Sequence, residues 1–428
     1  MLDLKFIREN KKLVEASIRN RGLKLDLDEF LRLDEEHRTL LIEVEGLKAE
    51  RNKANDEITA IMKSKKNPKE LIGKMKVVSQ KISDLDKKVD EISQNISKFI
   101  YLIPNIPDKS VPVGGTESNK IVRAWGKNPT FSFNPRDHIE LSELLGIISF
   151  GTASKITGSN FVLYIGSGAR MERALINFML DLHTKKHGYI EVFPPFLVNR
   201  RSMTGTGQLP KLEEDMYRLK DDDLFLIPTA EVPVTNIHSN ETLEEDELPI
   251  YYTAYTACFR REAGSYGKDT KGLIRVHQFD KVELVKFVKP ERSYDELEKL
   301  LTDAEEVLQL LELPFRVVQL ATGDISFSAS KCYDIELYAP GLDKYLEVSS
   351  CSNFTDFQAR RANIRYRPKA KEKGQKAEYV HTLNGSGVAL ARLVIAILEN
   401  YQNRDGSVKI PKALVPYMDG LETITPPA

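Results

Sequence analysis

Apolar residues in the first quarter of the chain recur at alternating steps of three and four positions. One run contains Leu40, Val44, Leu47, Arg51, Ala54, Ile58 and Ile61, and the other contains Leu71, Met75, Val78, Ile82, Leu85, Val89, Ile92, Ile96 and Phe99. This heptad spacing places one apolar seam along each of two paired helices. Residues 64–68 lie between the runs and end in a proline, which predicts a tight turn. We therefore predict an antiparallel helical hairpin, called the arm below, with a small helix in residues 1–26 packed at its base.

The pattern changes after the prolines at positions 104 and 107 and the Val113–Gly115 segment, which indicate a linker. Residues 170–187 and 293–312 have helical periodicity, whereas residues 251–262, 273–288, 333–338 and 344–350 alternate as strands do. Strands separated by short loops favour an antiparallel sheet with helices packed on it, which is an α+β fold. We expect an N-terminal domain at residues 1–107 and a second domain at residues 108–428.

Composition narrows the functional class only slightly. The 62 basic and 63 acidic residues nearly cancel, so overall charge does not indicate a polyanionic partner. The three cysteines, Cys258, Cys332 and Cys351, favour neither a disulfide framework nor a cysteine zinc site. The N-terminal residues have no apolar core typical of a secretory signal, and no long uncharged apolar stretch predicts a membrane span. We expect a protein of the reducing cytoplasm.

The arm carries a local excess of positive charge. Between positions 63 and 81 there is a single acidic residue, Glu70, against seven lysines: Lys63, Lys65, Lys66, Lys69, Lys74, Lys76 and Lys81. A basic stripe on a helical arm fits contact with a nucleic-acid backbone. The same lysines would also solvate a structural coiled coil or one that binds a protein partner, so the pattern alone leaves these alternatives open.

An unusual set of side chains falls on one face of the strand expected at 273–288. With a period of two, that face carries Arg275, His277, Phe279, Lys281, Glu283, Val285 and Phe287. Arginine can bind phosphate, phenylalanine can stack on a base, and a carboxylate can hold an ammonium or hydroxyl group. Arg260 ends the preceding strand, and a short loop would bring it beside this face. The alternative is a solvent-exposed sheet face, which the pattern does not exclude.

These residues also carry a family resemblance. Residues 259–264 (FRREAG) and 272–283 (GLIRVHQFDKVE) resemble motif 2 of class II aminoacyl-tRNA synthetases in its seryl form. The other segments agree in order: 187–195 resembles motif 1, 204–210 (TGTGQLP) and 229–231 (TAE) resemble active-site segments, 347–353 resembles the ATP-proximal strand, and 383–387 (LNGSG) with the following helix resembles motif 3. The chain thus resembles bacterial-type seryl-tRNA synthetases over nearly its whole length.

The resemblance implies activation of L-serine by ATP with Mg²⁺, and no zinc. It implies a serine pocket formed by Thr229, Ala230, Glu231, Arg260, Glu283, Asn384 and Ser386. It implies an ATP site formed by Arg260, Arg261, Glu262, Arg275, Phe279, Glu347, Val348, Ser349, Ser350 and Arg392. Arg260 and Arg392 would be catalytic, and Glu347 and Ser350 would hold Mg²⁺ with ATP. The last two have opposite strand parity, so both can face ATP only if the strand bulges or ends there.

The resemblance also implies partners. The arm would bind tRNA(Ser), with tRNA(Sec) as a further candidate, and motif 1 would form a homodimer. Two expectations remain open at this stage. Arg392 lies off the apolar stripe of its helix, so it is either a solvated side chain or part of an anion site. A synthetase-like paralogue that lost tRNA charging would keep the same core, although here the motif arginines and the basic arm are all present.

Overall fold

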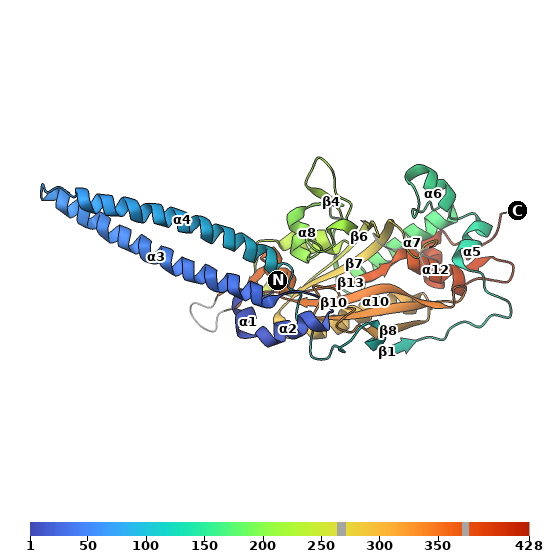
Figure 1. The fold of residues 1–428 in the computed structure, drawn as a ribbon. Coiled ribbons are helices and arrows are strands. Elements are labelled where there is room, and N and C mark those ends of the chain that lie inside the picture. Colours follow the sequence, from blue (N-terminus) through green and yellow to red (C-terminus); the bar gives the residue numbers. More distant parts are fainter. Residues whose placement is uncertain (263–270, 370–375, 428) are drawn as a thin grey trace. The chain divides into compact units, whose positions relative to one another are not determined.

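The chain divides into a helical unit, Leu2–Pro104, and a mixed unit made of Met1 and Asn105–Ala428 (Figure 1). The structure is a computed structural model and describes residues 1–262, 271–369 and 376–427. No helix in this described part of the chain is long and apolar enough to cross a membrane.

The helical unit contains the predicted hairpin. Its elements are α1 (Leu4–Glu9), α2 (Lys11–Asn20), α3 (Leu27–Lys63) and α4 (Lys69–Ile100). All the heptad positions named above are partly or fully buried, while most residues between them are exposed. Lys65 adopts a left-handed backbone conformation in the turn, with φ of 57°. The heptad prediction is confirmed, but residues 1–26 form two short helices instead of one.

Ion pairs link the two long helices of the arm. Lys81 Nζ lies 2.7 Å from Glu43 Oε1, and Lys48 Nζ lies 3.0 Å from Asp86 Oδ1. Each pair joins α3 to α4, but both are partly exposed, so each contributes little free energy compared with the buried seam. One of the seven lysines counted above, Lys81, is thus used within the arm, and Lys74 pairs with Glu70 on the same helix.

The mixed unit is built on an eight-stranded sheet. Its strand order is β1-β8-β9-β10-β13-β7-β6-β2. Neighbouring strands pair in the antiparallel direction, except that β2 runs parallel to β6. The strands are β1 (Lys120–Trp125), β2 (Ile190–Glu191), β6 (Ile250–Phe259), β7 (Gln278–Val288), β8 (Phe315–Gln319), β9 (Lys331–Ala339), β10 (Lys344–Thr355) and β13 (His381–Ala389).

Helices and small sheets surround this sheet (Figure 1). The helices are α5 (His138–Leu145), α6 (Phe150–Thr157), α7 (Ser167–Lys185), α8 (Arg200–Thr206), α9 (Glu231–Thr235), α10 (Ser293–Leu310), α11 (Phe357–Ala362) and α12 (Leu390–Asn400). The small sheets pair β3 (Leu197–Asn199) with β4 (Leu224–Leu226), β14 (Val408–Lys409) with β15 (Thr423–Ile424), and β5 (Thr242–Glu244) with β11 (Arg365–Arg367) and β12 (Glu378–Tyr379). The α+β fold with an antiparallel sheet and an N-terminal helical hairpin is as predicted.

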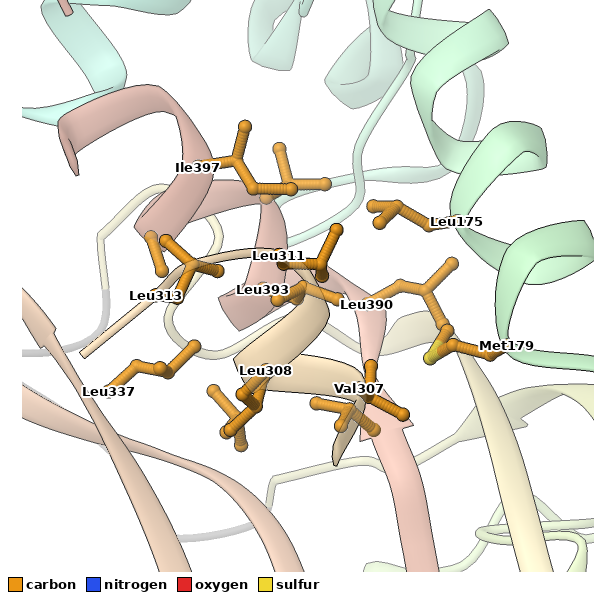
Figure 2. Close-up of a cluster of buried hydrophobic side chains, with 14 of the residues drawn as sticks. Leu175, Met179, Val307, Leu308, Leu311, Leu313, Leu337, Leu390, Leu393 and Ile397 are labelled. Atoms are coloured by element: carbon orange, nitrogen blue, oxygen red, sulfur yellow. The ribbon is translucent and has the colours of Figure 1, made fainter. Parts of the chain in front are cut away.

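The largest apolar core lies on one face of the sheet. Figure 2 shows side chains of α7, α10 and α12 packed together there, among them Leu175, Val307 and Leu393. On β7, Val282 and Leu284 belong to this core, whereas Val285 and Phe287 belong to a second cluster. Because strand residues alternate between faces, the odd-numbered residues of β7 point away from the main core. This opposite face carries Lys281 and Glu283, whereas Phe279, near the start of the strand, is partly buried against the main core.

The strand expected at 273–288 is shorter than predicted. It begins at Gln278, and residues 273–277 form turns in front of it. The physical reason is that backbone donors in this stretch bond outside the sheet. The Leu273 N–H donates to His138 Nε2 over 3.2 Å, and the His277 N–H donates to the Asn160 carbonyl over 2.8 Å. Arg275 and His277 therefore do not belong to the strand face on which they were predicted.

Candidate active site

A cavity of about 320 Å³ is lined by residues of β7, β10 and β13 and of the turns at 273–276. This volume falls in the lower part of the range of small-molecule sites. Most of the residues expected to bind ATP or serine line it: Thr229, Glu231, Arg260, Glu262, Arg275, Phe279, Glu347, Val348, Ser350, Asn384, Ser386 and Arg392. Four expected residues do not line it, namely Ala230, Arg261, Glu283 and Ser349. Residues distant in sequence are thus brought together, mostly as predicted.

One end of the cavity is buried and holds opposite charges. Glu283 on β7 is fully buried, and its Oε2 lies 2.5 Å from Lys281 Nζ. The Thr229 hydroxyl donates to the same carboxylate over 3.3 Å, and Asn384 Nδ2 donates to Oε1 over 2.9 Å. Ser386 lies directly opposite Glu283 on β13. The alternative of a solvent-exposed charged face is therefore wrong for Lys281 and Glu283.

A second carboxylate, Glu231 at the start of α9, lines the same end of the cavity. Gln358 Nε2 donates to its Oε1 over 2.6 Å. Burial raises the pKa of Glu231 to about 7, and the negative charge of Glu283 contributes in the same direction. Ala230 is fully buried between Thr229 and Glu231, so it packs in the core beneath the pocket and does not face it.

Arg260 also lines the cavity. Its guanidinium carbon lies 5.3 Å from the ring centre of Phe279, and its Nε donates to the Pro228 carbonyl over 3.3 Å. A cation over the ring face is held by the ring's quadrupole, which fixes the direction of the arginine. Arg260 thus lines the cavity together with Phe279 and with the Glu231 carboxylate.

The other end of the cavity is more open and carries two arginines. Arg275 Nη1 donates to Glu262 Oε2 over 2.9 Å. Arg392, the third residue of α12, donates from Nη1 to the Glu347 carbonyl over 2.7 Å and from Nε to the Ile274 carbonyl over 3.3 Å. Arg392 is therefore not merely a solvated side chain of its helix. Arg261 is exposed and does not line the cavity, and its contact with ATP stays a prediction.

Strand β10 bulges where the parity argument requires it. Glu347 pairs with Glu336 on β9, but Ser349 pairs with Ile335, so Val348 is an extra residue. As a result Glu347, Val348 and Ser350 all line the cavity. Ser349 is buried and donates to the Ser386 carbonyl over 2.6 Å, which supports the serine end; its contact with ATP stays a prediction.

A buried histidine positions the turns at 271–276. His138 is on α5, and its Nδ1 lies 3.1 Å from Glu399 Oε1. Its Nε2 accepts a hydrogen bond from the Leu273 N–H. A Cβ on Gly272, whose φ is 66°, would lie only 2.2 Å from His138 Nε2. The histidine therefore fixes the backbone that carries Ile274, Arg275 and Val276 to the cavity.

The glycines of the LNGSG segment serve packing. Gly385 and Gly387 lie on strand β13. A Cβ on Gly385 would lie 2.3 Å from Leu300 Cδ2, and one on Gly387 would lie 2.7 Å from His183 Nε2. Helix α12 begins only at Leu390. The last two residues of the FRREAG segment, Ala263 and Gly264, lie outside the described residues.

Comparison with known proteins agrees with this arrangement. The family model described as "Seryl-tRNA synthetase N-terminal domain" matches residues 1–107, and "tRNA synthetase class II core domain (G, H, P, S and T)" matches residues 214–401. A serine–tRNA ligase of Geotalea uraniireducens is 57% identical over 99% of this chain and 100% of its own length. One from Caldanaerobacter subterraneus is 58% identical over 98% of both chains. The chain belongs to the seryl-tRNA synthetase family.

A solved structure of the same family has this fold. The seryl-tRNA synthetase of Pyrococcus horikoshii, solved in complex with ATP, has a TM-score of 0.93 and 41% identity, with both chains covered completely. The resemblance to seryl-tRNA synthetases, the class II fold and the serine–tRNA ligase activity predicted from the sequence are therefore confirmed for this member of the family.

Several residues of this synthetase's cavity were missed by the sequence analysis. Lys281 was placed on the strand face but given no role, and Gln208 was quoted only as part of TGTGQLP. The cavity is further lined by Ser326, Phe327, Ser328, Ser352 and Phe354. The polar, small-residue stretch 322–330, directly before a strand, is the signal that could have indicated a binding loop.

The sequence analysis also gave no role to Asp334. It lies directly opposite Ser350 on β9, and burial together with the charge of Glu347 holds its pKa well above the ordinary range.

Proposed function

We propose that this cavity activates L-serine with ATP and that the protein then transfers serine to the 3′ end of tRNA(Ser). The observation that carries the proposal is a single cavity lined by the Glu231 carboxylate and by Arg260, Arg275 and Arg392, with buried Glu283 directly behind the lining residue Lys281. Such a site suits a small zwitterion at one end and a polyphosphate at the other. The relative from P. horikoshii was solved with ATP, which supports the nucleotide assignment.

The serine pocket is assigned to Thr229, Glu231, Glu283, Asn384 and Ser386, with Ala230 behind them. Glu231 and Glu283 are the negative groups available to an ammonium. A buried carboxylate that bonds the serine hydroxyl would be left unpaired by alanine, which lowers the rate with alanine strongly. Threonine carries an extra methyl group, so the buried walls around Thr229 and Ser386 would have to exclude it.

The ATP site is assigned to Glu262, Arg275, Phe279, Glu347, Val348, Ser350 and Arg392. Phe279 stacks on the adenine ring, Glu262 contacts its edge, and Arg275 with Arg392 binds the β- and γ-phosphates. Glu347 and Ser350 supply the oxygen ligands that Mg²⁺ prefers, and the bulge brings both to the cavity. Mg²⁺ bound there with ATP would neutralise phosphate charge.

The first chemical step is in-line displacement at the α-phosphorus. A carboxylate oxygen of serine forms the new P–O bond, and the bond to the β-phosphate oxygen breaks, giving seryl-adenylate and pyrophosphate. Arg260 is placed to bind both the serine carboxylate and the α-phosphate, where charge shifts during the attack. In the second step the tRNA ribose hydroxyl attacks the seryl carbonyl carbon and AMP leaves. Both steps depend mainly on positioning and charge neutralisation.

The arm is assigned to tRNA binding, within an N-terminal domain at residues 1–107 that precedes a catalytic domain at 108–428. Lys65, Lys66 and Lys69 lie around the turn between α3 and α4, where all three are exposed. Among the residues that the structure describes, none of the three pairs with an acidic side chain, unlike Lys74 and Lys81, so they are available to phosphates. tRNA(Sec) is a further substrate of the same arm if the organism makes it, and the cytoplasm is the proposed location.

A homodimer is the proposed assembly, formed through the motif 1 region. Ile190 on β2 is 59% exposed and Phe193, just after it, is 76% exposed. Large exposed apolar side chains next to each other on the edge strand of a sheet are typical of an interface. Sedimentation of the purified protein measures the assembly, and Phe193→Glu should convert the dimer to a monomer.

The deciding experiment is amino-acid-dependent ATP–pyrophosphate exchange with serine, threonine, alanine and glycine. We expect exchange with serine alone, and its loss in Glu283→Ala. Exchange with another amino acid would overturn the substrate, and no exchange at all would overturn activation by this cavity. Replacing Lys65, Lys66 and Lys69 with glutamate tests the arm separately, because tRNA charging should fall while exchange remains unchanged.

A further inference from the structure

Glu283 is separated from the cavity by three polar side chains of the same protein. Lys281 Nζ lies 2.5 Å from its Oε2, Thr229 Oγ1 donates to the same oxygen, and Asn384 Nδ2 donates to Oε1. These three residues line the cavity, whereas Glu283 does not. An amino acid that enters the cavity therefore meets Lys281 before it can reach the carboxylate assigned to read it.

The Lys281 head group has the chemistry of the substrate group that it covers. It is a primary ammonium, and it donates to Thr229 Oγ1 over 2.8 Å as well as pairing with Glu283. Glu283 and Thr229 are thus two of the acceptors that the proposed pocket offers to the ammonium of serine, beside Glu231. If Lys281 stayed in place, a second ammonium would have to share one buried carboxylate with it, which Coulomb repulsion opposes.

We propose that Lys281 occupies the position of the substrate ammonium and gives it up when L-serine binds. The ammonium of serine then pairs with Glu283 and Thr229. The lysine head moves along the cavity toward Arg260, where the serine carboxylate and the α-phosphate add negative charge. This inference rests on the serine pocket proposed above and makes Lys281 a residue that determines specificity for amines.

The exchange has a physical advantage over a vacant pocket. A carboxylate buried without a partner is strongly destabilising, and replacing one ammonium by another keeps Glu283 paired throughout. Lysine suits the role because its charge sits on a flexible four-carbon stem, whereas the guanidinium of arginine is a rigid fork. A ligand without an ammonium group cannot take the place of Lys281, so it cannot reach Glu283.

The test compares two serine fragments as inhibitors of serine-dependent pyrophosphate exchange in the full-length protein. Ethanolamine keeps the ammonium and the hydroxyl, and 3-hydroxypropionate keeps the carboxylate and the hydroxyl. In Lys281→Met, ethanolamine no longer competes with a tethered ammonium, so its inhibition constant should fall at least about tenfold. The constant for 3-hydroxypropionate should not fall. An unchanged or higher ethanolamine constant in Lys281→Met overturns the proposal.

Two control variants separate this inference from the pocket assignment. Lys289→Met removes a lysine beyond the far end of β7, where it pairs with Glu245, and should change neither inhibition constant. Glu283→Gln should raise the serine KM and, combined with Lys281→Met, should abolish the gain in ethanolamine binding. If serine KM does not respond to Glu283→Gln, the pocket assignment itself has failed; if it responds but ethanolamine binding does not improve in Lys281→Met, only the displacement is wrong.

A structure of the unmodified protein with L-serine keeps the proposal testable if Lys281→Met fails to fold. We expect the serine nitrogen within hydrogen-bond distance of Glu283 and Thr229, and Lys281 Nζ moved away from Glu283. A serine-bound structure in which Lys281 Nζ still lies within about 3 Å of Glu283 would overturn displacement.

Discussion

Both ends of the cavity contain ion pairs, but the pair at the serine end is buried and the pairs at the ATP end are partly exposed. At the ATP end, Arg275 pairs with Glu262 and Arg392 contacts Glu347, and the arginine side chains are 45% and 29% exposed. At the serine end, the side chains of Lys281 and Glu283 are 7% and 0% exposed. In both places the protein's own charges pair with one another before any substrate arrives.

The difference in depth determines what each end can do when a substrate binds. An exposed ion pair contributes about 0–1 kcal/mol, so the arginines can leave their acidic partners for phosphates at little cost. Removing one partner of a buried pair costs about 3–5 kcal/mol. At the buried end, a substrate therefore has to replace Lys281 as the partner of Glu283. At the open end, the ion pairs of the arginines can simply break.

The largest expected effect is a difference in coupling free energy between the Lys281–Glu283 pair and the Arg275–Glu262 pair. Lys281→Met and Glu283→Leu should each destabilise the protein by about 3 kcal/mol, and the double variant should regain most of that loss. Arg275→Ala and Glu262→Ala should each change stability by less than about 1 kcal/mol and should add. Urea unfolding of all six variants measures both cycles, and equal coupling at the two ends would contradict the comparison.

The next effect is the pH dependence of stability that the raised pKa of Glu231 predicts. Its pKa is about 7 when folded and near 4.5 when unfolded, so the folded protein binds the extra proton and loses stability as pH rises through 7. Glu231→Gln should therefore raise the melting temperature relative to the unmodified protein at pH 8, and the difference should vanish below about pH 4.5. A difference that does not change with pH would mean that Glu231 is ionised throughout.

Salt should weaken the binding of ATP more than the binding of serine. Raising KCl from about 0.05 M to about 0.5 M screens exposed charges much more than buried ones. We expect the KM for ATP to rise several-fold while the KM for serine changes little, and Arg392→Ala should raise the ATP KM about tenfold and reduce the salt effect. Pyrophosphate exchange at each salt concentration gives both constants. A parallel rise of the two KM values would place the serine end in contact with solvent.

The smallest effect concerns the histidine behind the turns at 271–276. His138→Asn shortens the side chain so that the Leu273 N–H loses its acceptor, a buried hydrogen bond of about 1 kcal/mol. The KM for ATP should rise about fivefold with little change for serine. His138→Gln, whose amide reaches the position of Nε2, should largely restore it. A change confined to serine would show that these turns do not support the ATP end.

Much of this site could be predicted because its residues lie in short, ordered segments. The heptads predicted the hairpin, and alternation along residues 279–287 placed Phe279, Lys281 and Glu283 on one face. The parity of Glu347 and Ser350 even required a bulge, which the register of β10 contains. Each of these features depends only on neighbours in sequence.

The rest could not be predicted because it depends on partners distant in the chain. Residues 273–277 leave the sheet since their donors bond to His138 and Asn160, more than a hundred residues earlier. Glu283 was expected to face the substrate, but Asn384 and Thr229 cover it. Ser349 shares its motif with two cavity residues and yet supports Ser386 from beneath. Spacing within one segment carries no information about such contacts.

The extra residue at Val348 has a consequence for how distant relatives are compared. Because Glu347 faces Glu336 while Ser350 faces Asp334, the two strands are out of step by one position across the bulge. An alignment without a gap between a bulged and an unbulged strand would equate residues that point to opposite sides of the sheet. Deleting Val348 would keep both Glu347 and Ser350 in the sequence and still turn Ser350 away from the cavity, so the presence of the expected polar residues does not guarantee a working site.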